Sequence, residues 1–154
     1  MKFTIENNNK IIQKQLVYLE EECSFYMNEI TDKIDIEVVL NKISLFVVDN
    51  KIIDISGFCG LNKSMISTCQ VPEFKKGFLK IEHNLKYGFA YGINKEDFPV
   101  YVNPQTGWVC IGNPEKSGNA VEFIDNCVAV IDGDKGFVSL WLKPQSLPSV
   151  VKNV

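Results

Sequence analysis

The sequence contains no arginine, since all 16 basic residues of its 154 are lysine. Lysine cannot make the planar, two-pronged contacts that arginine makes with phosphates and base edges. The 19 acidic residues bring the net charge to −3, so the basic surface that nucleic acids or anionic membranes require is not expected either. We therefore predict that neither nucleic acid nor membrane is a partner. The lack of arginine beside abundant Ile, Asn and Lys is typical of an AT-rich gene on a phage or another mobile element.

Long apolar runs and paired cysteines are missing as well. No stretch approaches the ~18 apolar residues of a membrane span, and the start, MKFTIENNNK, lacks the apolar core of a secretory signal. We therefore expect a cytoplasmic protein, with residues 1–154 as a single domain. The five cysteines form no C-x-x-C pair, which predicts reduced thiols that serve as small buried hydrophobic residues.

The motifs of catalysis and metal binding are absent too. His83 is the one histidine, and we expect it to be an exposed turn residue, because no cysteine pair has the spacing of a zinc site. In IDGDKG (131–136), a calcium loop counted from Asp132 would place Phe137 at the glycine position and Lys143 at the bidentate glutamate position. Phosphate loops, dinucleotide fingerprints and G-x-S-x-G elbows do not occur. We expect no catalytic residue, metal or cofactor, and hence no enzyme.

One segment has a helical pattern. Apolar residues recur at spacings of three and four over residues 9–30, and Asn7 to Asn9 could cap the helix start. The pattern predicts one long N-terminal helix. Its apolar stripe consists of Ile12, Leu16, Leu19, Cys23, Tyr26 and Ile30.

The following residues change to the period of a strand. Residues 31–43 are ambiguous, because their alternation fits a strand while Val39, Leu40 and Ile43 also fit a short helix. The stretch 44–58 reads as two strands joined by Asp49 and Asn50, both of which tolerate the positive φ of a tight hairpin. Residues 59–77 are broken by Gly and Pro, which predicts irregular structure.

From residue 78 onward, the pattern predicts an antiparallel meander with short, polar turns. In KYGFAYGI (86–93), alternation places three aromatic residues on one face and small residues on the other, which predicts a central strand. The bare face would allow close packing or form a groove for a partner's peptide. The polar tail after residue 144 is expected to run over the surface. The predicted strands cover 78–82, 86–93, 98–102, 107–112, 120–124, 127–131 and 136–142.

Two of these turns share a design. IDGDKG is predicted to be a type I turn followed by Gly136 in the left-handed conformation. NPQTG (103–107) has the same pattern, with Pro104 where φ near −65° is required. The resulting fold class is α+β, a long N-terminal helix packed on a mostly antiparallel, meandering sheet that is strand-rich over 44–142.

The segment NAVEFIDNCVAVIDGDKGFVSLWLKP (119–144) resembles the closing strands of small cytosolic immunity proteins from bacterial contact-dependent growth inhibition and polymorphic toxin systems. In these strands a Val-Glu-Phe strand, an acidic-Gly turn and a final Leu-Trp-Leu strand follow one another. The resemblance covers about a sixth of the chain and implies an inhibitor that pairs with a cognate toxin domain, often a nuclease. Such an inhibitor covers the toxin's active site or its substrate path.

The leading hypothesis is therefore an immunity-type protein with an acidic surface for a basic toxin cleft. Addition of a partner strand to an exposed sheet edge is a second possible mode. The alternative function is a β-rich accessory domain that binds a small ligand through the aromatic region 87–108. The predicted partner-binding residues are Glu21, Glu22, Glu122, Asp125, Asp132 and Asp134.

Overall fold

The computed structural model describes residues 1–29, 31–82 and 84–152, and these residues are almost entirely β. The helical elements among them are a single 3-10 turn, η1 (Leu61–Lys63), and a last short helix, α1 (Ser149–Lys152). The strands are β1 (Phe3–Asn7), β2 (Leu16–Leu19), β3 (Ser24–Met27), β4 (Ile36–Leu40), β5 (Ile43–Val48), β6 (Lys51–Phe58), β7 (Met65–Ile66), β8 (Lys75–Ile81), β9 (Ala90–Gly92), β10 (Val100–Val102), β11 (Val109–Gly112), β12 (Asn119–Ile124), β13 (Cys127–Ile131) and β14 (Phe137–Leu142).

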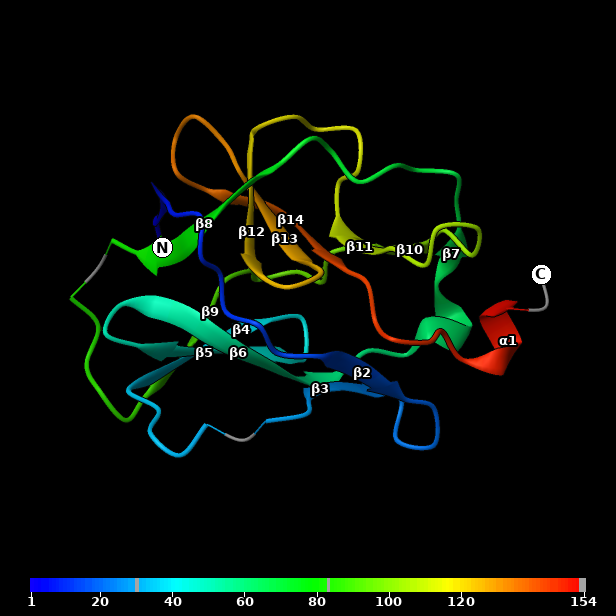
Figure 1. Cartoon of the computed structure of the whole chain (residues 1–154), viewed down its shortest axis with the longest axis horizontal. Coiled ribbons are helices and arrows are strands. Elements are labelled where there is room, and N and C mark those ends of the chain that lie inside the picture. Colours follow the sequence, from blue (N-terminus) through cyan, green and yellow to red (C-terminus); the bar gives the residue numbers. More distant parts are fainter. Residues whose placement is uncertain (30, 83, 153–154) are drawn as a thin grey trace.

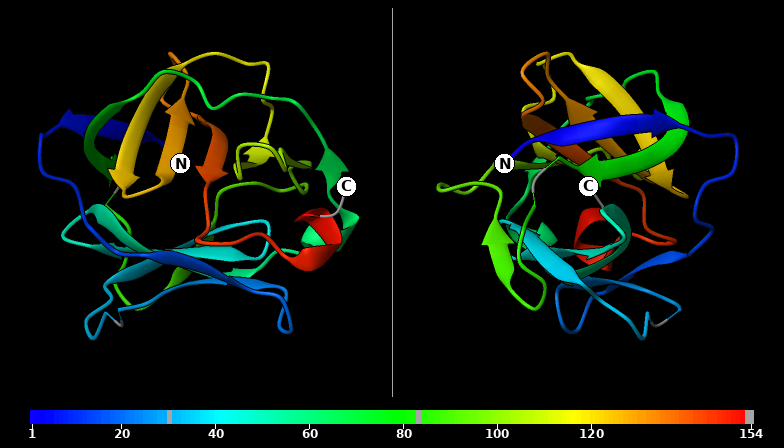
Figure 2. Two further views of the ribbon diagram at one scale, coloured as in Figure 1. Left: turned by 45° about the vertical axis from the view of Figure 1, so that its right-hand side comes forward. Right: turned by 90° about the vertical axis from the view of Figure 1, so that its left-hand side faces the viewer.

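All these strands belong to one curled sheet of 14 strands with the order β7-β10-β11-β14-β13-β12-β8-β6-β5-β4-β9. β1 pairs with β8, and β3 joins β2 to β6. The sheet bends at β8, which has a two-residue parallel pairing with β12 and a single pairing between its Lys80 and Lys51 of β6. The two halves of the sheet therefore form two layers that face each other, with β2–β6 below β12–β14 (Figures 1 and 2).

The main core lies between these two layers. It contains Phe25, Leu45 and Ile55 from one layer and Phe123 and Leu140 from the other, and all five side chains are fully buried. A second cluster covers the outer face of β11, β13 and β14, where residues 69–71 pack over it. The second cluster consists of Trp108, Cys110, Val128, Val130, Val138 and Trp141. β13 is therefore buried along its whole length, which explains its continuous apolar sequence.

The predicted N-terminal helix over 9–30 is wrong, and so is the α+β fold class built on it. Residues 16–27 instead form the β2–β3 hairpin. Leu16 and Tyr18 point into the core with Phe25 and Met27, while Leu19 is 38% exposed. The burial of the side chains therefore alternates with the period of two that is typical of a strand, and the β-branched and aromatic residues of this segment favour strands. Glu20 to Cys23 form the turn, with Cys23 at φ 50°. Ile30 lies outside the described residues.

The next two segments of the chain form strands. Residues 36–40 of the ambiguous segment form β4, whose alternating burial is that of a strand with one covered face. The hairpin at Asp49 and Asn50 is confirmed, because both residues have positive φ (52° and 64°) between β5 and β6. These angles match the type I′ turn that suits the twist of paired strands.

The predicted meander is correct for two groups of consecutive antiparallel neighbours, the pair β10 and β11 and the group β12, β13 and β14. The sheet as a whole is mixed, with parallel pairs β4–β9, β7–β10 and β8–β12. The segment 86–93 is not a central strand, since only Ala90–Gly92 is extended and pairs at the end of the sheet. Gly88, at φ 83°, turns the chain just before it.

The tail after residue 144 is also different from the prediction. It carries apolar residues into the core, with Leu147 8% and Val151 2% exposed. The Gln145 N–H donates to the carbonyl oxygen of Leu16 at 2.9 Å. The tail therefore fastens the β2 end of one layer to β14 in the other, instead of running free over the surface.

Candidate functional site

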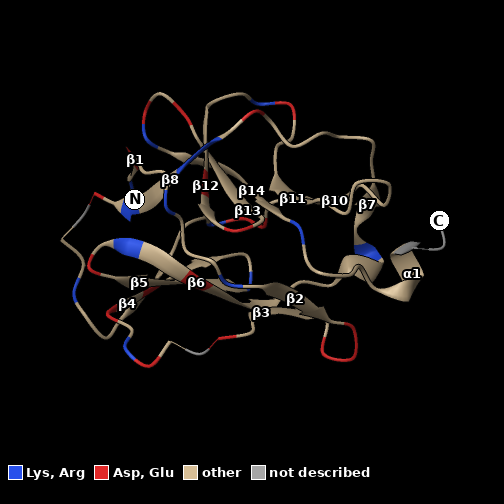
Figure 3. Cartoon of the chain, viewed as in Figure 1, with Lys and Arg blue, Asp and Glu red and all other residues tan. Residues whose placement is uncertain are grey.

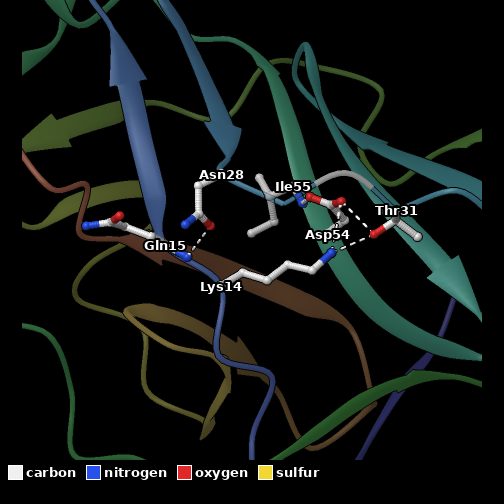
Figure 4. Close-up of polar contacts among 6 residues, drawn as sticks. All are labelled: Lys14, Gln15, Asn28, Thr31, Asp54 and Ile55. Atoms are coloured by element: carbon white, nitrogen blue, oxygen red, sulfur yellow. Dashed lines mark hydrogen bonds and ion pairs between the residues drawn. The ribbon is translucent and has the colours of Figure 1, made fainter.

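A cluster of buried polar side chains joins the crossing segment between β1 and β2 to the centre of β6 (Figure 4). The Lys14 ammonium lies 2.5 Å from the Thr31 hydroxyl oxygen and 3.2 Å from Asp54 Oδ2. The Thr31 hydroxyl donates to the same Asp54 oxygen at 2.8 Å, and the Ile55 N–H donates to Oδ1. The side chains of Lys14 and Asp54 are each 11% exposed. Every charged atom of the cluster thus has a partner.

The chemistry of this cluster is structural. A threonine between an ammonium and a carboxylate resembles an activated nucleophile, but the Lys14 ammonium donates to the Thr31 oxygen and so stabilises its lone pair. Beside it, the Gln15 N–H donates to Asn28 Oδ1 at 2.9 Å. These contacts hold two connecting segments, the one before β2 and the one after β3, against β6. Sequence patterns did not reveal them, because the three residues stand on three separate segments.

Three of the acidic residues that were predicted to bind a partner lie in the turns of two hairpins. Glu21 and Glu22 are exposed in the turn between β2 and β3. Asp125 is exposed in the turn between β12 and β13. Glu122, in contrast, is only 6% exposed, and its Oε2 accepts the Asn126 N–H of its own turn at 3.1 Å. Glu122 therefore stabilises the turn instead of facing a partner.

The last two acidic residues lie in the β13–β14 turn. Asp132 Oδ1 accepts the N–H groups of Gly136 at 2.8 Å and Asp134 at 2.9 Å. The bond from Gly136, then that from Asp134, together with Lys116 at 3.5 Å, lowers the pKa of Asp132. Asp134 is exposed. The predicted left-handed Gly136 is wrong, because Lys135 has the positive φ, 66°. The turn is closed by an aspartate side chain.

The six acidic residues do not come together. Five of them occupy three turns and Glu122 lies in β12, and the turns of Asp125 and Asp132 stand at opposite ends of β13. Figure 3 shows the acidic turn between β2 and β3 well apart from the loops above β12. Among the described residues, no group of three or more His, Cys, Asp or Glu is arranged to hold a metal ion. His83 lies outside the described residues.

The aromatic region 87–108 is also divided between surfaces. Trp108 is 9% exposed in the outer cluster, and Tyr101 packs against that cluster. Phe98 packs against the inner core. Tyr87 and Phe89, in contrast, are 62% and 58% exposed. The region therefore does not form the single aromatic cage that a small-ligand site would need.

The sheet ends at β7 on one side and at β9 on the other, and the β9 end carries the two most exposed large hydrophobic side chains of the described residues. β9 pairs in parallel with β4 and with no other described strand. The chain before β9 runs along β4, because the Gly88 N–H donates to the Asp35 oxygen (2.8 Å) and the Glu37 N–H to the Phe89 oxygen (3.2 Å). Ile34, which precedes Asp35, is 43% exposed. We call Ile34, Tyr87 and Phe89 the β9-edge patch.

Burial raises the pKa values of three cysteine thiols. Burial raises the pKa of Cys59 to about 12 and the pKa values of Cys110 and Cys127 well above the ordinary value. Their thiols therefore stay protonated near neutral pH, and thiolate is the reactive form. All five cysteines are free of disulfides.

The sequence matches no protein-family model, and it matches no curated protein significantly. Within the described part of the chain, no helix is long and apolar enough to cross a membrane. The local geometry is therefore the basis on which a function can be proposed.

Proposed function

We propose that this chain is a non-catalytic inhibitor of the immunity type, which binds a cognate toxin domain and covers its active site or its substrate path. A nuclease is the toxin class that we favour, because the net charge of −3 suits a basic partner surface. The observation that carries the proposal is the β9-edge patch, where large apolar side chains flank a strand whose outer edge has no partner among the described residues.

Free strand edges are normally protected in proteins by charged residues, proline or bulges, because they pair readily with other chains. β9 reads Ala90-Tyr91-Gly92, so it carries no charged residue, proline or bulge, and its length of three residues is the one feature that limits pairing. The adjoining Phe89 side chain is 58% exposed. An exposed aromatic residue beside such an edge is the kind of anchor that dominates binding energy in protein interfaces. The patch therefore supports a partner that is itself a protein.

The backbone of β9 supports strand addition as the mode of binding. The Phe89 oxygen and the Ile93 N–H both bond to β4. Because strand groups alternate in direction, the N–H and C=O groups of Ala90 and Gly92 point away from the sheet. A partner strand would take these groups, while Tyr87 and Phe89 would contact its side chains.

The exposed carboxylates then have a secondary role. Glu21, Glu22, Asp125 and Asp134 lie on turns outside the β9-edge patch. Such charges raise the rate of approach to a basic partner without taking part in the final contact. The buried Glu122 has no part in this, and we withdraw it from the interface on the basis of its bond to the Asn126 N–H.

The test starts from the gene neighbourhood, where we expect a large secreted protein with a variable C-terminal domain beside the gene for this chain. Expression of that domain should kill cells, and co-expression of this chain should protect them. A Tyr87→Lys/Phe89→Lys variant should lose protection, because lysine at the edge opposes strand pairing.

The matched control is Phe58→Lys, which alters an aromatic residue that is 48% exposed at the end of β6. We expect this control to protect as the unchanged chain does. Failure of the unchanged chain to protect would contradict the function. Equal protection by the edge variant and the control would contradict the proposed surface.

A further inference from the structure

A second surface feature lies away from the β9 edge, where the end of β1, the start of β8 and the start of β12 meet. A groove of about 500 Å³ opens there, and it continues into an adjoining hollow of about 450 Å³. Asn7 and Lys75 line both parts. We call the two parts together the β1–β8–β12 groove. The rest of its lining is Ile5, Asn8, Asn9, Glu73, Phe74, Lys76, Gly118, Asn119 and Ala120.

The strand pairings fix the walls of this groove. Asn7 is opposite Gly77 in the β1–β8 register, and Lys75 is opposite Val121 in the β8–β12 register. A Cβ atom at Gly77 would lie 2.4 Å from the Glu6 carbonyl oxygen, so only glycine permits this close approach of β1. The Lys10 N–H donates to Asn8 Oδ1 at 2.9 Å, which turns the chain away beyond the groove. The lining is thus held by backbone pairing.

Six polar side chains of the lining have no hydrogen-bond or ion-pair partner among the described residues. Three of them are asparagine amides, each with two donors and a two-lone-pair acceptor. The others are two lysines and one glutamate, which leaves one excess positive charge. Phe74, 37% exposed, adds an aromatic ring to the same groove. The six side chains are Asn7, Asn9, Glu73, Lys75, Lys76 and Asn119.

We propose that the β1–β8–β12 groove binds a short acidic oligosaccharide. Sugar hydroxyls donate and accept at once, which matches the mixed capacity of the amides. The apolar face of a sugar ring would lie on Phe74, as amphipathic groups do on aromatic rings. The lysines would neutralise a carboxylate of the sugar, while Glu73 accepts from hydroxyls. This inference is independent of the immunity-type function.

The lining disfavours the other anionic ligands. A nucleotide or polyphosphate would bring several negative charges, whereas the groove offers Lys75 and Lys76 against Glu73, in a chain without arginine. Addition of a peptide strand would not fill the groove, because β8 already has β1 on one side and β12 on the other at this point. The asparagine amides, which offer both donors and acceptors, therefore favour a polyhydroxylated ligand.

The test uses the ¹⁵N-labelled full chain, titrated with hexasaccharides and followed by NMR. The acidic probe is a xylose-based hexasaccharide that carries a single glucuronate, and the neutral probe is xylohexaose. We expect shifts at the amides of residues 74–76 and 118–120 with an acidic probe. Phe74→Ala and Asn119→Ala should each weaken binding about tenfold. Lys75→Gln should remove the preference for acidic over neutral sugar.

The matched controls are Phe58→Ala and Asn62→Ala, which change an exposed aromatic residue and an exposed asparagine outside the groove. Both should bind the acidic probe as the unchanged chain does. Circular dichroism of each variant confirms that it is folded. No shift with any probe, equal affinity for the neutral probe, or shifts located outside the groove would each overturn the proposal.

Discussion

The β12–β14 unit and the β9 edge, both from the C-terminal two thirds of the chain, have opposite surroundings. β13 has a buried side chain at every position, with the inner core on one face and the tryptophan-containing cluster on the other. β9 has one partner strand, and Phe89 beside it is 58% exposed. In the β12–β14 unit, buried apolar residues stabilise the fold. At the β9 edge, similar residues contribute little burial, and this contrast is the reason that the proposed binding surface is placed there.

This comparison separates stability from binding. Substitutions in β12–β14 should change the free energy of unfolding, and substitutions at the β9 edge should change partner affinity alone. Measurements of unfolding and of binding should therefore give opposite outcomes in the two regions.

The largest effect is expected in the outer cluster. Trp141→Ala removes a side chain that is 1% exposed and should lower the free energy of unfolding by about 3–5 kcal/mol. Phe89→Ala should change it by less than about 0.5 kcal/mol. Urea denaturation of the two variants measures both values. A large loss of stability in Phe89→Ala would mean that the edge belongs to the core.

The next effect concerns the cluster of Lys14, Thr31 and Asp54. Lys14→Met leaves the Asp54 carboxylate buried without its cation, and should lower the free energy of unfolding by about 3 kcal/mol. A Lys14→Met/Asp54→Leu double variant should recover part of this loss, because no unpaired charge remains. Denaturation of the single and double variants as a cycle gives the coupling. Simple additivity would contradict the role of the ion pair.

A smaller effect distinguishes two neighbouring carboxylates. Glu122→Gln weakens the bond to the Asn126 N–H and should lower the free energy of unfolding by about 1 kcal/mol. Asp125→Lys, at an exposed position, should leave stability within about 0.5 kcal/mol. It should instead slow association with the toxin domain and flatten the salt dependence of its rate. Stopped-flow measurements at several salt concentrations check the second part.

The smallest effect depends on pH. The folded state lowers the pKa of Asp132 below its ordinary value of 3.8. The ionised carboxylate therefore stabilises the fold above that ordinary pKa, and this contribution disappears as pH falls through the lowered value. Asp132→Asn should be less stable than the unchanged chain near neutral pH, and the difference should shrink below about pH 4. Thermal unfolding between neutral and acidic pH measures the difference.

The sequence predicted the positions of several turns, although it placed the left-handed residue of the β13–β14 turn at Gly136 instead of Lys135. Asp49 and Asn50 marked a hairpin because few residue types tolerate two successive positive φ angles. β12, β13 and β14 were also located within a residue or so, since polar turns separate their continuous apolar runs. In both cases a few neighbouring residues determine the local structure.

The failures arose where distant segments decide the structure. Residues 9–30 contain apolar residues at helical spacing, but pairing with β6 selects the β2–β3 hairpin. The 86–93 strand was predicted to be central, yet its place beside β4 depends on a parallel pairing with residues about 50 positions earlier. The acidic residues were chosen by type, and tertiary burial removed Glu122 from the surface. Ile34 gave no signal, because one exposed isoleucine is unremarkable in a sequence.

The central claim is that a partner strand pairs with the outer edge of β9, and amide hydrogen exchange tests it most directly. In the complex with the toxin domain, exchange at the Ala90 and Gly92 amides should slow at least about tenfold. The Ile93 N–H, which already bonds to the Val39 oxygen, is the internal control and should change little. Unchanged exchange at Ala90 and Gly92 in a saturated complex would contradict the account.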